Sequence, residues 1–332
     1  MRLNINISKK KIFLLFFNVI FWFSIFFVIL KIANLKINLD IFNNIVLSRL
    51  AISFVFYILF AWIRGIRFAY ILDSKNYLVS YGISGIYVLS CAVFPGGIGE
   101  AMLPVYTKKY LGIPFSKGAA LLLTTRVFDV LFVIIFFIFS LFANSLSLNK
   151  LNILNLTGLF IIILIFSIII LIFFYDKARI FIIQLIKQKV ERNDILPSIA
   201  KKMIVFMERI NDDLTHINSK KKNMVIFLTL ISRISIFISF LFLFKSLNLN
   251  ISIVQAVFIS TFATLMLIIP VQGLGGFGSY EIWITMALLS IGIARNIALS
   301  TSVPVQLLMF LFSLAEGILG YLFLAVSRKK VL

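Results

Sequence analysis

The chain has 332 residues, of which 61% are hydrophobic and only 13% are charged, and its mean hydropathy is +1.09. A soluble domain carries about 25% charged residues, so the composition excludes an ordinary water-soluble fold and indicates that a bilayer surrounds most of the chain. The net charge of +20 does not indicate nucleic-acid binding, because the Lys and Arg residues gather in short segments between apolar runs, as they do beside membrane spans.

Six apolar runs are long enough to cross a bilayer as helices, which takes about 20 residues. In chain order they are residues 12–30, 45–63, 118–142, 155–175, 223–245 and 298–326. With the N-terminus inside, the cytoplasmic segments hold 24 of the 32 Lys and Arg residues, and the opposite side holds five. These segments are 1–11, 64–77, 108–117, 176–222 and 327–332. The positive-inside rule therefore predicts a multi-pass protein of the cell (inner) membrane with both termini in the cytoplasm.

Two further apolar stretches, residues 78–94 and 251–269, end at clusters of proline and glycine. After the first cluster, residues 101–111 reach only about 16 Å as a helix, which is half the thickness of the hydrocarbon layer. Each stretch therefore predicts a re-entrant hairpin built from a broken helix, the first opening to the cytoplasm and the second to the outside. If both arms of each hairpin crossed fully, the chain would instead have ten spans.

The two interrupted passages resemble one another. Each has an apolar arm, a proline, several glycines and a glutamate, and then reaches Gly-Ile at 112–113 or 292–293. The flanking spans run in opposite directions, so the pattern predicts an inverted repeat, which is typical of secondary transporters. The predicted fold is an all-α, polytopic helical membrane protein with about six full spans and two re-entrant broken-helix hairpins. It forms a single integral membrane domain (1–332), with repeat one at about 45–142 and repeat two at about 223–326.

The stretch 176–222 is the only sizeable polar region of the sequence. Apolar residues recur through it at steps of three and four, which predicts a helix with one apolar stripe. Eleven Lys and Arg residues in this stretch favour contact with the anionic inner leaflet. We therefore expect a cytoplasmic amphipathic segment on the membrane surface.

Four acidic residues lie within apolar sequence: Glu100, Asp129, Glu281 and Glu316. Each costs about 2.5–3.5 kcal/mol at the centre of a membrane helix, so each needs a partner, water or a ligand. Glu100 and Glu281 follow glycine-rich breaks, where free peptide groups and helix N-termini can bind an anionic headgroup. The expected substrate-binding residues are Gly96, Gly97, Gly99, Glu100, Arg126, Asp129, Gly275, Gly276 and Glu281.

For the other charged residues, a structural role is expected or remains one of two alternatives. Arg126 and Asp129 are three apart on one helix, so they form either an ion pair with each other or a functional pair. Arg233 is expected to pair with Glu281 or Glu316. Arg64 and Arg67 are expected to reach the lipid phosphates at the membrane surface. The expected structural residues are Pro95, Pro270, Arg233 and Glu316, the last because Gly317 and Gly320 beside it favour close helix packing.

The sequence has one cysteine, Cys91, and one histidine, His216. No intramolecular disulfide can form, and a zinc site would need carboxylate ligands. The sequence also has no Walker-type loop and no GxSxG or HExxH motif. We therefore expect no metal, no cofactor and no enzymatic activity.

The segment FPGGIGEAMLPVYTKKYLGIPFSKGAALLLTTRVFDVLF (94–132) resembles the transmembrane region of lysylphosphatidylglycerol synthases and the stand-alone flippase-like proteins built on it. PVQGLGGFGSYE (270–281) resembles the second glycine-rich element of that family. The motif positions are Pro95, Gly97, Gly99, Glu100, Arg126 and Asp129. In the synthases this region is held to move aminoacylated phosphatidylglycerol across the bilayer, whereas a separate soluble domain, for which this chain has no room, makes it. Many members carry an Arg where this chain has Leu103.

The resemblance implies a lipid translocase for an anionic phospholipid or a polyprenyl-linked substrate. The alternative is a non-catalytic accessory protein of envelope lipid or glycan synthesis, working with a glycosyltransferase or another envelope enzyme. The partners to consider are membrane lipids, such an enzyme and further copies of the chain, but not nucleic acid.

Overall fold

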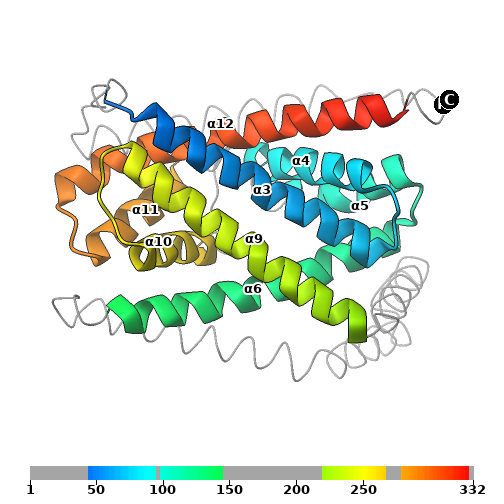
Figure 1. Cartoon of the computed structure of the whole chain (residues 1–332), viewed down its shortest axis with the longest axis horizontal. Helices are drawn as coiled ribbons and strands as arrows, with labels where there is room; N and C mark the ends of the chain where they lie inside the picture. The colour runs from blue at the N-terminus through cyan, green and yellow to red at the C-terminus, as the bar shows by residue number, and fades with distance from the viewer. Residues whose placement is uncertain (1–43, 95–97, 145–218, 267–277, 329–332) are drawn as a thin grey trace, which may run out of the picture.

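A computed structural model describes residues 44–94, 98–144, 219–266 and 278–328, and every regular element in these ranges is an α-helix (Figure 1). The helices are α3 (Leu47–Leu72), α4 (Tyr77–Val93), α5 (Ile98–Leu111), α6 (Phe115–Asn144), α9 (Ser219–Ser246), α10 (Ile253–Met266), α11 (Ser279–Ser290) and α12 (Arg295–Arg328). Several predictions lie outside the described residues: the spans 12–30 and 155–175, residues 176–218 of the amphipathic segment with His216, and Pro95, Gly96, Gly97, Pro270, Gly275 and Gly276.

Four of the described helices, α3, α6, α9 and α12, are long and apolar enough to cross a membrane. This confirms four of the predicted spans and a multi-pass membrane protein. The helices extend beyond the predicted bounds, except at the start of α3, which begins at Leu47 and not at residue 45. The largest difference is in α3, which continues from the predicted end at residue 63 to Leu72. It ends at Asp73, whose φ of 56° is left-handed and whose N–H donates to the carbonyl of Ala69.

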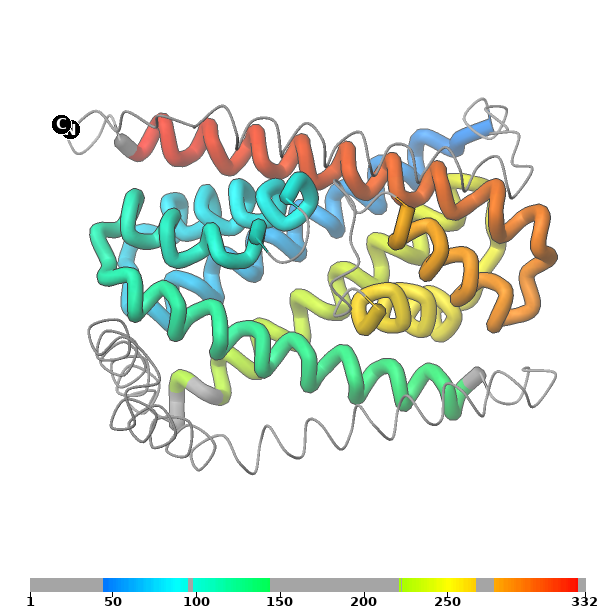
Figure 2. Tube along the Cα trace, turned by 180° about the vertical axis from the view of Figure 1, so that it is seen from behind, coloured from blue at the N-terminus to red at the C-terminus, as the bar shows by residue number. Residues whose placement is uncertain are grey.

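Four shorter helices form two pairs, α4 with α5 and α10 with α11. They have 17, 14, 14 and 12 residues, so each is shorter than the roughly 20 residues that a full crossing requires. The two pairs lie at opposite ends of the bundle (Figures 1 and 2). α4 begins at Asn76, whose side chain accepts a hydrogen bond from the N–H of Val79 at 3.2 Å.

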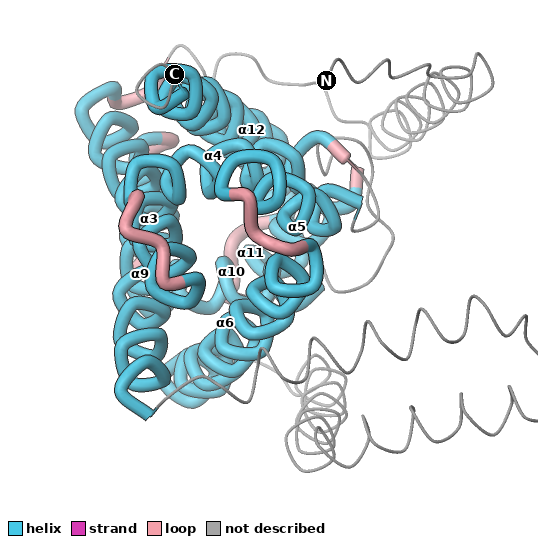
Figure 3. The backbone as a smooth tube through the Cα atoms, turned by 90° about the vertical axis from the view of Figure 1, so that its right-hand side faces the viewer, coloured by secondary structure: helices cyan, strands magenta, loops and turns pink. Residues whose placement is uncertain are grey.

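The crossing pair α3 and α9 is the most extensive helix contact among the described elements. At one end Lys221 Nζ lies 2.6 Å from the Asp73 carboxylate. Toward the other end, Ser53 Oγ donates to the Ser239 carbonyl at 2.8 Å, and Arg49 donates to the carbonyl of Lys245 in the last turn of α9. The two helices are therefore antiparallel. Seen end-on, they lie on one side of the bundle, and α5 and α6 lie on the other (Figure 3).

Further contacts pair α4 with α12, α3 with α4, α10 with α6, α5 with α6, α11 with α12 and α9 with α10. Glycines allow the closest of these approaches. A Cβ at Gly320 would lie 2.8 Å from the carbonyl oxygen of Gly82, and one at Gly85 would lie 2.7 Å from that of Glu316. α4 and α12 thus touch backbone to backbone, as small residues permit in membrane bundles.

The surface of the bundle is apolar and much of its interior is polar. Phe139, Phe142 and Ile318 are 60%, 74% and 52% exposed, which fits contact with lipid chains. Arg67 and Glu316, by contrast, are at most 1% exposed. Because buried charges need partners, the polar interior marks the part of the fold where a site must be sought.

Candidate functional site

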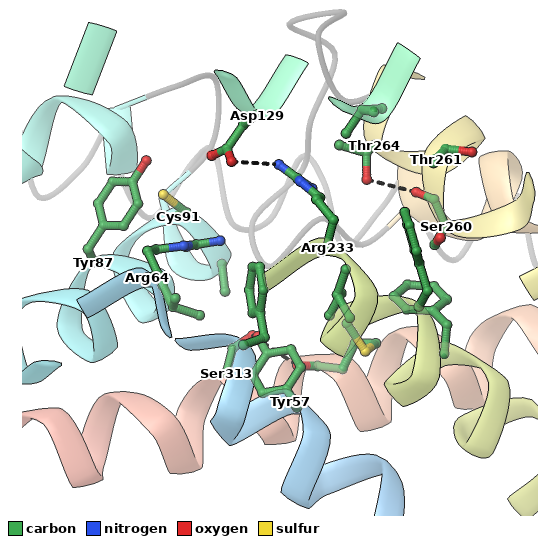
Figure 4. Close-up of a pocket in the computed structure, with 18 of the residues that line it drawn as sticks. Tyr57, Arg64, Tyr87, Cys91, Asp129, Arg233, Ser260, Thr261, Thr264 and Ser313 are labelled. Atoms are coloured by element: carbon green, nitrogen blue, oxygen red, sulfur yellow. Dashed lines mark hydrogen bonds and ion pairs between the residues drawn. The ribbon is translucent and has the colours of Figure 1, made fainter. Parts of the chain in front are cut away.

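A cavity of about 270 Å³ lies at the centre of the bundle. Its lining comes from α3, α4, α6, α9, α10, α11 and α12. The inner ends of the short helices reach it: Tyr87 and Cys91 near the end of α4, Ser260 and Thr264 near the end of α10, and Tyr280 in the first turn of α11 (Figure 4). Both helix pairs therefore contribute to one site.

A buried ion cluster forms part of the cavity wall. Arg67 donates to both carboxylate oxygens of Asp129, at 2.7 Å to Oδ1 and 3.1 Å to Oδ2. A guanidinium nitrogen of Arg233 lies 3.1 Å from Asp129 Oδ1 (Figure 4). Arg67 also donates to the hydroxyl of Thr229 at 2.9 Å. One carboxylate thus serves two guanidinium groups and joins α3, α6 and α9, so the cluster carries a net positive charge.

The cluster corrects three predictions. Arg67 is 1% exposed and does not reach the membrane surface, because α3 continues past the predicted span and turns this side chain toward Asp129. Arg233 pairs with Asp129 and not with Glu281 or Glu316. Of the two alternatives for Arg126 and Asp129, the ion pair with each other is also wrong, because each has its ion-pair partner on another helix.

Glu100 and Arg126, two of the predicted substrate-binding residues, come together as an ion pair between α5 and α6. Both side chains are 40% exposed, so this pair is far less enclosed than the Asp129 cluster. Arg126 also donates to the Tyr87 hydroxyl at 3.2 Å and lines the cavity. Gly99 packs against the backbone of Ser90, where a Cβ would overlap the carbonyl oxygen, and this contact holds the start of α5 against α4.

Arg64 is the fourth arginine of the cavity. Its guanidinium lies 4.3 Å from the centre of the Phe60 ring and 5.8 Å from that of Tyr87. Within the described ranges, no carboxylate forms an ion pair with it. Arg64 therefore presents a cation to the cavity without a neutralising partner there.

The two remaining acids have local roles. Glu281 accepts a hydrogen bond from the N–H of Gly278 at 2.7 Å, and so caps α11 where Gly278 turns with a φ of 90°. Glu316 is buried between α4 and α12 and accepts from the Tyr81 hydroxyl at 3.2 Å. Neither residue lines the cavity. The structure thus brings Glu100, Arg126 and Asp129 to the site but not Glu281.

A second wall of the cavity carries hydroxyl groups. Ser260, Thr261 and Thr264 come from α10, and Tyr57 and Ser313 share a hydrogen bond of 2.8 Å between α3 and α12. None of these five residues stands out in the sequence, because a lone Ser or Thr in an apolar run is usual in packed membrane helices. The three hydroxyl residues within five positions of α10 were the available signal.

Within the described ranges, no group of three His, Cys, Asp or Glu residues could hold a metal ion. The cavity can instead receive an anion, because four arginines line it together with Asp129 as the single acidic lining residue of the described part.

The comparison with known families fits this site. The family model described as "Lysylphosphatidylglycerol synthase TM region" matches residues 11–317, which include every described helix except the end of α12 and every cavity residue named above. No curated protein and no solved structure matches the chain. The match covers nearly the whole chain and confirms the resemblance carried by its two glycine-rich motifs, so the protein belongs to the family of lysylphosphatidylglycerol synthase transmembrane regions.

Proposed function

We propose that the protein moves an anionic lipid across the membrane by binding its phosphate-bearing headgroup in the central cavity. The observation that carries the proposal is the set of four arginines that line a cavity inside a membrane-spanning bundle. A single arginine at the centre of a membrane helix costs about 2.5–3.5 kcal/mol. Four of them around one cavity need anions or water to offset that cost.

Acidic residues neutralise only part of the positive charge of these four arginines. Arg67 and Arg233 share Asp129, and Arg126 contacts Glu100. Arg64 lies over the rings of Phe60 and Tyr87 and forms no ion pair within the described ranges. Among the described residues around the cavity, positive charges thus exceed negative ones by two. A phosphate oxyanion suits this surplus, because guanidinium groups bind phosphate through paired, charge-assisted hydrogen bonds.

The helix arrangement supports the predicted re-entrant hairpins and inverted repeat. Contacts of the first half have counterparts in the second: α3 with α4 matches α9 with α10, α5 with α6 matches α11 with α12, and α4 with α12 matches α10 with α6. The short pairs lie at opposite ends of the bundle (Figure 2), and α4, α10 and α11 each contribute residues to the cavity lining. In transporters with this plan the substrate site lies between the repeats and opens to each side in turn.

Charge distribution supports the proposed orientation. The end of the bundle where α4 begins carries Lys75, Lys108, Lys109, Lys117 and Lys221, whereas the end where α10 begins carries Arg49, Lys245 and Arg295. By the positive-inside rule the first end faces the cytoplasm. The α4–α5 pair would then enter from the cytoplasm and the α10–α11 pair from the outside.

The test is transbilayer movement in vesicles that contain the full chain. Fluorescent phosphatidylglycerol or phosphatidylcholine is placed in the inner leaflet, and its arrival outside is followed by a membrane-impermeant quencher. We expect the protein to accelerate movement of the anionic lipid, and Arg64→Gln to abolish most of that acceleration.

Arg49→Gln is the matched control, because Arg49 lies on the same helix and contacts the α9 terminus outside the cavity. It should move the lipid at the wild-type rate. No acceleration by the wild type, with or without a proton gradient, would contradict the proposal. Equal rates in wild type and Arg64→Gln would contradict the assigned site.

A further inference from the structure

We infer that the cavity takes a phosphate lipid whose headgroup bears uncharged hydroxyl groups, such as a glycerol or a sugar, and that it rejects a cationic, aminoacylated headgroup. Arg64 holds the phosphate, and the α10 hydroxyls accept hydrogen bonds from the headgroup. The inference rests on the proposed function and specifies its substrate class.

The cavity has two chemically different walls. The arginines come from α3, α6 and α9, and the hydroxyls Ser260, Thr261 and Thr264 come from α10 (Figure 4). Figure 4 shows Arg64 beside Cys91 and Tyr87, and the three α10 residues on the far side of Arg233. A ligand that fills the cavity therefore meets donors with positive charge at one end and neutral polar groups at the other.

The α10 hydroxyls are already committed as donors. Thr261 donates to the Val257 carbonyl at 2.7 Å, Thr264 donates to the Ser260 carbonyl at 2.7 Å, and Ser260 donates to the Val257 carbonyl at 3.1 Å. A hydroxyl whose proton is engaged keeps lone pairs that accept. The part of the ligand that faces α10 must accordingly supply O–H or N–H groups.

Charge selects hydroxyls over an ammonium group. Asp129 is occupied by Arg67 and Arg233, and Glu100 is occupied by Arg126, so no carboxylate that lines the cavity in the described part is left for an added cation. An aminoacyl ammonium would add a further positive charge to a cavity that four arginines already line, and like charges repel strongly at low dielectric. A glycerol or sugar offers the same hydrogen-bond donors without the charge.

Arg64 is placed to hold the phosphate. Its guanidinium carbon lies 4.3 Å from the centre of the Phe60 ring, and its N–H groups donate to none of the described residues. The other three arginines each contact a carboxylate. The cavity volume of about 270 Å³ falls just below the roughly 300–1,000 Å³ typical of pockets that enclose drug-sized ligands. It therefore suits a headgroup but not the acyl chains.

The single cysteine of the sequence provides the readout. Cys91 lines the cavity and is half-buried, so its rate of modification by a membrane-permeant maleimide reports whether the cavity is occupied. The full chain is placed in phosphatidylcholine nanodiscs with phosphatidylglycerol, phosphatidic acid or lysylphosphatidylglycerol as the added lipid. At about ten times the dissociation constant, bound phosphatidylglycerol should slow the modification about tenfold.

Lysylphosphatidylglycerol should protect little at the same concentration, and phosphatidic acid should protect less than phosphatidylglycerol. Thr264→Val should lower the affinity for phosphatidylglycerol about tenfold, which is equivalent to the loss of one hydrogen bond, and should leave the affinity for phosphatidic acid unchanged. Thr124→Val is the matched control, because Thr124 also donates to a carbonyl of its own helix but lies outside the cavity. Arg64→Gln should remove protection by both anionic lipids.

Two outcomes would overturn the inference while leaving anionic lipid binding intact: equal protection by lysylphosphatidylglycerol, or equal protection by phosphatidic acid that Thr264→Val does not change. Protection by none of the three lipids would contradict the proposed function itself. Size-exclusion profiles of the variants, compared with the wild type, identify any loss of protection that comes from misfolding.

Discussion

Replacing Asp129 by Asn removes the charge between Arg67 and Arg233 with little change in side-chain size. A guanidinium nitrogen of each arginine contacts the same Asp129 Oδ1, at 2.7 and 3.1 Å, so these nitrogens lie less than about 6 Å apart. At an effective dielectric constant of about 20, two unit charges at that distance repel by about 3 kcal/mol. Removal of one member of a buried ion pair generally costs about 3–5 kcal/mol, so we expect Asp129→Asn to destabilise the fold by that amount.

The free energy of unfolding in mixed micelles, titrated with a denaturing detergent, measures this loss. Glu100→Gln is the control, because its ion pair is 40% exposed on both sides and such pairs contribute only about 0–1 kcal/mol. The loss of stability in Arg233→Gln should lie between those of Asp129→Asn and Glu100→Gln, because this variant leaves Arg67 and Asp129 as a neutral pair. If Asp129→Asn were as stable as Glu100→Gln, the ion cluster would not hold α3, α6 and α9 together, and the reasoning would be refuted.

Three further predictions concern packing and orientation. Gly320→Ala should lower the free energy of unfolding by about 1–3 kcal/mol in the same titration, because its Cβ would lie 2.8 Å from the Gly82 oxygen. Ala325→Val is the control: it lies on an exposed face of α12 and should change stability by no more than about 0.5 kcal/mol. Tyr81→Phe should cost about 1–3 kcal/mol by leaving the buried Glu316 carboxylate without its hydroxyl partner, and adding Glu316→Gln should recover part of the loss; no recovery would show that the charge is not the cause. In a Cys91→Ser background, a membrane-impermeant maleimide should label Ser290→Cys from the outside and should label Lys109→Cys only after the membrane is permeabilised. Labelling of both cysteines from one side would contradict the inverted repeat.

The helical architecture could be predicted from the sequence because a bilayer imposes a simple length requirement. Runs of about 20 apolar residues located the four long helices to within ten residues at each end, and the proline and glycine clusters located the ends of the short ones. Glu100 could be singled out from the sequence because a charge beside a glycine-rich break in apolar sequence needs a special environment, and the structure pairs it with Arg126.

The ion-pair partners could not be predicted, because they depend on which helices pack together. Arg126 and Asp129 lie close enough on α6 to pair, but Glu100 and Arg67 approach them from other helices. Arg67 follows an apolar run, and hydropathy alone does not distinguish an arginine that faces the interior from one that reaches the membrane surface. That Arg67 faces Asp129 depends on how α3 and α9 pack against each other and against α6.

The cavity-lining hydroxyl groups of α10 could not be predicted for a related reason. Ser260, Thr261 and Thr264 satisfy their own protons on α10 carbonyls, as Ser and Thr do in many membrane helices. Their sequence pattern is therefore the same whether they face a neighbouring helix or a cavity.

The most direct test of the arginine-lined cavity as a headgroup site is an experimental structure of the full chain in nanodiscs rich in phosphatidylglycerol. We predict density for a phosphate against the Arg64 guanidinium, continuing toward Ser260 and Thr264. A cavity that holds only water under these conditions, with lipid headgroups confined to the two ends of the bundle, would contradict the account.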